Sequence, residues 1–82
     1  MNDQEILSRV AEVIGEITED DREIKMEDKL IEDIGLVSIG FVEMIVQLEE
    51  VFDISFPDNM LTDNNLETVR DVIENIKNLI RE

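Results

Sequence analysis

The 82-residue sequence has no cysteine and no histidine, and only seven Lys and Arg residues accompany its 22 Asp and Glu residues. The missing cysteines exclude disulfide bonds and thiolate chemistry, and the missing histidines remove the base of most hydrolytic triads and common zinc ligands. The shortage of cations leaves a net charge of −15, which repels the phosphates of nucleic acids and of anionic membranes. We therefore expect neither nucleic acid nor membrane as a partner, but proteins that carry positive patches.

Long apolar runs are also missing, so the sequence predicts no membrane-spanning helix, and no basic segment followed by an apolar stretch indicates a signal peptide. Hydrophobic residues nevertheless make up 43% of the chain, which is enough for one modest core and too many for an acidic disordered tail. We expect residues 1–82 to form a single domain that is monomeric and cytoplasmic.

The chain has only one proline and three glycines, the residues that interrupt helices. From Asp3 to about Ile17, apolar residues recur at steps of three and four, which predicts an amphipathic helix with Asn2 or Asp3 as its cap. Its apolar face would consist of Ile6, Leu7, Val10, Val13, Ile14 and Ile17. Residues 18–37 lack this period, and a connection of about 20 residues is long for a compact domain. It therefore holds a short helical turn near Lys29–Glu32 or shapes a site at its end.

A second helix is predicted from Ile39 to Phe52. Its buried face would consist of Ile39, Val42, Ile45, Leu48 and Phe52. Pro57 disfavours a continuation of this helix, because the residue before a proline avoids helical dihedral angles. Residues 58–61 can then form one short turn.

The last helix is predicted to begin after Thr68, because threonine is a good cap and Asp71 follows three positions later as a capping-box partner. Its buried face would consist of Val69, Val72, Ile73, Ile76, Leu79 and Ile80. Together these elements predict an all-α four-helix bundle, with three main helices, one short helix and a long loop between the first two helices.

Ser38 stands directly before the second predicted helix. A serine in that position is typically a cap, because its oxygen accepts a backbone N–H of the first turn. It is a poor catalytic nucleophile, since the chain has no histidine and offers no evident lysine as a base. The unpaired N–H groups and the dipole of a helix start do favour a phosphate group. The position alone leaves a cap and a phosphate attachment point as two interpretations.

Several segments around this serine resemble the acyl carrier protein family, namely Leu30–Ile39, Val42–Met44, Leu48–Phe52, Ile54–Asp58 and Leu66–Ile73. The resemblance covers the whole chain, including its length, acidity, helix order and long first loop. It implies that a phosphopantetheinyl transferase attaches a 4′-phosphopantetheine arm covalently to Ser38, and that acyl groups ride on the thiol of this arm as thioesters. The chain would then be a carrier and no enzyme. It would present its cargo to acyl-transferring or condensing enzymes of a fatty-acid, polyketide or similar pathway.

The chain departs from the family pattern on both sides of Ser38. The pattern is usually Asp-Ser-Leu, whereas this chain reads Val37-Ser38-Ile39, and Gly40 stands where another acidic residue is usual. By resemblance, the missing aspartate helps to orient the transferase and its metal ion. These departures suggest a specialised carrier that serves a dedicated pathway.

Acidic residues of the second helix form the predicted partner surface. By resemblance, Glu43, Glu49 and Glu50 face basic patches of partner enzymes, and Val46 is an exposed apolar contact between them. A single glutamate on the outer face of a helix is usually only solvated. The net charge of −15 beside the proposed attachment residue favours electrostatic steering of partners instead.

Other functions are less well supported. A calcium site fails because residues 58–65 lack the ligand spacing and the glycine of an EF-hand loop, so no metal site is predicted. The main alternative is an acidic helical adaptor that binds a basic protein partner without a prosthetic group. A catalytic function ranks third, because no motif brings an acid and a base together.

Overall fold

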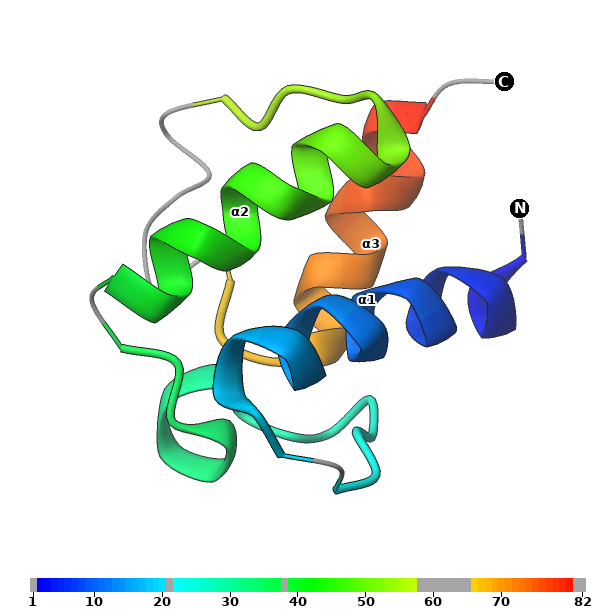
Figure 1. The fold of residues 1–82 in the computed structure, drawn as a ribbon. Coiled ribbons are helices and arrows are strands. Elements are labelled where there is room, and N and C mark those ends of the chain that lie inside the picture. The colour runs from blue at the N-terminus through cyan, green and yellow to red at the C-terminus, as the bar shows by residue number, and fades with distance from the viewer. Residues whose placement is uncertain (1, 21, 38, 58–65, 81–82) are drawn as a thin grey trace.

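The computed structural model describes residues 2–20, 22–37, 39–57 and 66–80. Within these residues the fold has three long helices and one short π-helical turn, in the order α1 (Asp3–Thr18), η1 (Leu30–Ile34), α2 (Ile39–Phe52) and α3 (Val69–Ile80) (Figure 1). The predicted all-helical fold with a long loop between the first two main helices is confirmed, and η1 provides the short turn predicted within that loop. The short turn predicted at residues 58–61 lies outside the described residues. None of the described helices is long and apolar enough to cross a membrane.

Helices α1 and α3 begin with the caps that the sequence predicts. Asn2 Oδ1 accepts the N–H of Glu5 at 2.8 Å, and Glu5 Oε1 accepts the N–H of Asn2 at 3.5 Å. At α3, Thr68 Oγ1 accepts the N–H of Asp71 at 3.2 Å, and the Asp71 carboxylate accepts the N–H of Thr68 at 3.1 Å. These reciprocal bonds satisfy N–H groups that have no partner within a helix, and they define where the two helices begin.

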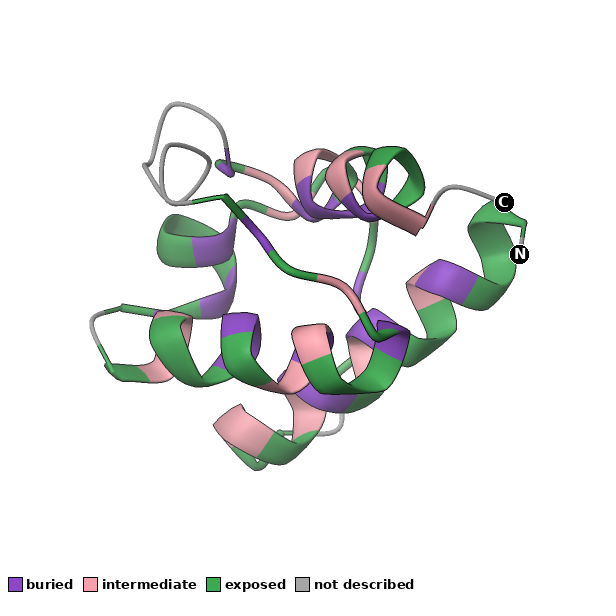
Figure 2. Cartoon of the chain, turned by 90° about the horizontal axis from the view of Figure 1, so that it is seen from above, coloured by how far each residue is buried: buried purple, intermediate pink, exposed green. Residues whose placement is uncertain are grey.

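The core lies between the three helices and the long loop, as the buried residues in Figure 2 show. Most members of the apolar faces predicted for α1 and α3 are buried, namely Ile6, Val10, Val13, Ile14, Val69, Val72, Ile73 and Ile76. The other predicted members are partly buried and pack against this core, namely Leu7, Ile17, Leu79 and Ile80. The loop contributes Ile24, Leu30, Ile34 and Leu36. Because these loop side chains are spaced irregularly, they attach the loop to the core at intervals without forming a long helix.

The predicted buried face of α2 is partly wrong. Ile39 and Val42 are 74% and 59% exposed, whereas Met44, outside the predicted face, is fully buried. The remaining predicted residues are buried, namely Ile45, Leu48 and Phe52. The reason is that α2 is apolar on nearly every side, so two apolar stripes have helical spacing and only packing against the other helices decides between them. The structure leaves the stripe through Ile39 and Val42 at the surface.

Backbone hydrogen bonds attach the long loop to the start of α3. Three N–H groups donate to carbonyls across this junction: Leu30 to Glu67 at 2.9 Å, Val69 to Asp28 at 3.0 Å, and Arg70 to Met26 at 2.9 Å. Within the loop, Arg22 Nη1 donates to the carbonyl of Asp33 at 2.6 Å and so links its first half to η1. These bonds therefore attach the loop to the start of α3 and join its first half to η1.

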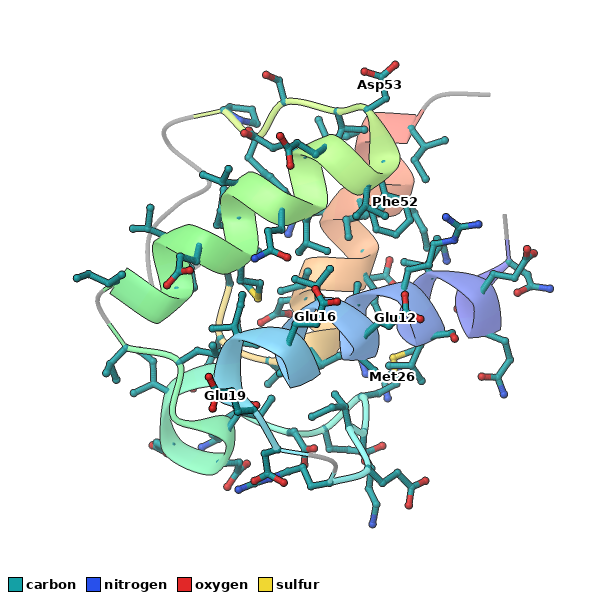
Figure 3. The ribbon with its side chains drawn as sticks, in the orientation of Figure 1. Glu12, Glu16, Glu19, Met26, Phe52 and Asp53 are labelled. Atoms are coloured by element: carbon teal, nitrogen blue, oxygen red, sulfur yellow. The ribbon has the colours of Figure 1, made fainter. Side chains whose placement is uncertain are left out.

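Charge repulsion is expected to limit the stability of this fold. The ion pairs found among the described residues all join exposed side chains, where each contributes little. Glu12, Glu16 and Glu19 follow one another along the exposed side of α1 and its C-terminal cap (Figure 3). We expect Tm to rise with NaCl, because the Debye length shortens from about 10 Å at 0.1 M to about 3 Å at 1 M. Mg²⁺ or Ca²⁺ should act at far lower concentrations.

Thermal melts followed by circular dichroism check this expectation. A Tm that stays constant in both titrations would show that the carboxylates are too far apart to destabilise the fold. The charge would then serve recognition alone.

Candidate functional site

The predicted attachment residue, Ser38, lies outside the described residues, but its neighbours in the chain are described. Val37 ends the loop and is 53% exposed, and the exposed Ile39 begins α2. The N–H of Gly40 donates to the carbonyl of Val37 at 3.0 Å and so joins the end of the loop to the first turn of α2. Both neighbours of position 38 are accessible to a partner.

The end of the loop is held in place directly before this position. Gly35 has a φ of 87°, a left-handed conformation that glycine adopts without steric cost, and its N–H donates to the carbonyl of Ile31 at 3.1 Å. Leu36 is 1% exposed, and its N–H donates to the carbonyl of Leu30 at 2.8 Å. The buried Leu36 therefore anchors the chain one residue before the exposed Val37.

The start of α2 packs beside the C-terminal end of α1. A methyl group added at Gly40 would lie 3.5 Å from Leu36 Cδ2 and 3.9 Å from Ile17 Cγ2, which are ordinary contact distances. In Figure 1 this end of α2 lies on the left, away from the side where α1 begins and α3 ends. A larger residue would therefore fit at position 40, so lack of space does not explain the glycine. Its effect is to leave the first turn without a side chain there.

The first turn of α2 also differs from the other two helices in charge. Asp3 and Glu5 lie in the first turn of α1 and Asp71 in that of α3, whereas the first turn of α2 has no acidic residue. The positive end of its dipole is therefore not offset by its own carboxylates, which favours an anionic group at this helix start. The described residues around position 38 fit a phosphodiester, since they are exposed and add no negative charge next to it.

The residues predicted to contact partners lie on α2, and they differ in how far they are exposed. Glu43 and Glu50 are exposed, and Val46 between them is 49% exposed. Glu49 is partly buried, and its Oε2 accepts the N–H of the buried Phe56 at 2.8 Å. The sequence analysis missed this bond, because nothing in the local pattern brings residue 56 back to residue 49.

Comparisons with known proteins identify the family of this chain. Residues 4–76 match the family described as "Phosphopantetheine attachment site". An acyl carrier protein of Campylobacter jejuni is 41% identical over 69 residues, which cover 84% of this chain and 87% of that protein. One from Borrelia garinii is 36% identical over 78 residues, or 94% of this chain and 95% of that protein.

The chain belongs to the acyl carrier protein family. A solved structure from Mycobacterium tuberculosis, described as an acyl carrier protein, has a TM-score of 0.81 and 28% identity to it, covering 88% of this chain and 95% of that one. The chain therefore shares the overall fold of that protein. Among the residues that the structure describes, no group of three or more metal-ligating side chains occurs in this carrier.

Proposed function

We propose that this acyl carrier protein holds its cargo on a 4′-phosphopantetheine arm attached covalently to Ser38. The observation that carries the proposal is the exposure of Val37 and Ile39, the two neighbours of position 38, at a helix start without acidic residues, in a family defined by phosphopantetheine attachment. Residues 1–82 then form one carrier domain that has no catalytic activity of its own.

Attachment would use Ser38 as the nucleophile and coenzyme A as the donor. The serine oxygen forms a bond to the phosphorus that bears the pantetheine, the bond from this phosphorus to the adenosine bisphosphate breaks, and the serine proton passes to a base of the transferase. Once bound, the arm supplies a thiol that holds an acyl group as a thioester. The chain itself orients the attachment point, since Leu36 anchors the loop and the positive end of the α2 dipole favours an anionic group at the helix start.

Partner enzymes would approach α2. Glu43, Glu49 and Glu50 offer negative charge to basic patches, and Val46 offers an apolar contact between them. Such partners are the phosphopantetheinyl transferase and the acyl-transferring or condensing enzymes of fatty-acid, polyketide or similar biosynthesis. The monomeric state and cytoplasmic location expected from the sequence stay predictions.

Intact-mass measurement tests the proposal. The purified chain is incubated with coenzyme A, Mg²⁺ and a broad-specificity phosphopantetheinyl transferase, and it is expected to gain the mass of one phosphopantetheine group. An unchanged mass with several transferases would contradict the proposal. It would favour instead the acidic adaptor that binds basic partners without a prosthetic group.

A further inference from the structure

Exposed apolar residues lie on both sides of the proposed attachment position in the chain and form an apolar stripe. Val37 lies on one side of this position in the chain, and Ile39, Val42 and Val46 follow on the other side. The last three are spaced by three and four residues, so they share one side of α2. The opposite side of this helix is buried in the core, which leaves the stripe as its outward apolar surface.

The surroundings of this stripe restrict what can cover it. A second copy of the chain is disfavoured, because the contact would bring together two proteins of net charge −15. Anionic lipid and nucleic acid are disfavoured by the same repulsion. The exposed Glu43 and Glu50 accompany the stripe on α2. The complementary surface is therefore that of a protein, apolar where it meets the valines and basic around them.

Val37 is held in place although it lies in the loop and not in α2. The hydrogen bond from the Gly40 N–H to its carbonyl fixes it to the first turn of α2, and the buried Leu36 fixes it from the other side. Any enzyme that brings coenzyme A to the next residue of the chain must also cover Val37. Residue 37 has no carboxylate that a cationic side chain or a metal ion of the enzyme could bind. Its valine side chain can instead be enclosed by an apolar pocket of the enzyme.

Building on the proposed function, we infer that Val37 is a specificity-determining residue. It selects a phosphopantetheinyl transferase that encloses residue 37 in an apolar pocket beside its active site. Ile39 and Val42 continue this contact along α2. These two residues, which the sequence pattern assigns to the core, thus gain a partner-binding role.

Steady-state kinetics with two enzymes test this inference. The first is the transferase from the genome encoding this chain that modifies the wild type fastest, and the second is a broad-specificity transferase. The substrates are the wild type, Val37→Thr and Val37→Asp. Matched controls carry the same changes at Val51, another valine of α2, which is 42% exposed.

With the first enzyme we expect Val37→Thr to raise KM about tenfold with kcat nearly unchanged, because its hydroxyl loses water in an apolar pocket. Val37→Asp should raise KM further, and both Val51 variants should stay within about twofold of the wild type. With the broad-specificity enzyme, Val37→Asp should be modified faster than the wild type. Unchanged Tm values would confirm that all variants are folded.

Equal kcat/KM values for the wild type and both Val37 variants with the first enzyme would overturn the inference while leaving the attachment to Ser38 intact. An unmodified wild type with every transferase would overturn the proposed function, and this inference with it.

Discussion

Replacement of Ser38 by alanine is expected to abolish the transfer of phosphopantetheine to this chain. The chain contains three serines, Ser8, Ser38 and Ser55, and only Ser38 precedes a helix start that has no acidic residue in its first turn. Ser8 lies within α1, and Ser55 lies in the segment after α2. Intact-mass measurement after incubation with coenzyme A and a transferase should therefore show one added group in the wild type and none in Ser38→Ala.

The other serines provide matched controls. Ser8→Ala and Ser55→Ala change the same side chain at exposed positions and should gain the same mass as the wild type. Thermal melts of all three variants exclude unfolding as the cause of any loss. A mass gain by Ser38→Ala, or a loss confined to Ser55→Ala, would place the attachment elsewhere.

Replacement of Glu49 by alanine is expected to destabilise the fold by about 2 kcal/mol, because hydrogen bonds to charged groups contribute about 1.5–3 kcal/mol and the N–H left behind is costly when buried. The bond lost is the one from the Phe56 N–H to Glu49 Oε2, at 2.8 Å. For a domain of this size each kcal/mol lowers Tm by about 4–8 °C, so a fall of about 8–16 °C should be seen in thermal melts.

Two further variants separate this bond from the effect of charge. Glu50→Ala removes an exposed carboxylate from the next position and should change stability by no more than about 0.5 kcal/mol. Glu49→Gln removes the charge but keeps an oxygen acceptor. Its loss of stability should therefore lie between the losses of Glu49→Ala and Glu50→Ala. Equal Tm values for Glu49→Ala and Glu50→Ala would show that the bond does not hold the segment after α2.

Much of the fold could be predicted because its signals are local. The caps at Asn2 and Thr68 depend on partners three residues away, and the apolar faces of α1 and α3 stand out against polar surroundings. Helix α2 gave an ambiguous pattern, since hydrophobic residues occur all around it. Its buried side depends on contacts with α1 and with the loop, so the assignment of Ile39 and Val42 to the core was wrong.

The site could be predicted only in part for the same reason. The exposure of Val46 agreed with the sequence-based expectation. The bond between Glu49 and Phe56 and the bond from Arg22 to the Asp33 carbonyl join residues that are seven and eleven positions apart. Such contacts follow from how the chain folds back on itself, and no local pattern in the sequence indicates them.

The backbone bonds between the long loop and the start of α3 have a consequence for dynamics. Each of them joins a residue of the loop to a residue at or just before the first turn of α3, as in the pair of Leu30 and Glu67. Neither segment can separate from the other without breaking bonds on both, so they open together as one cooperative unit. The loop that leads to Val37 therefore has the local stability of the helix to which it is bonded.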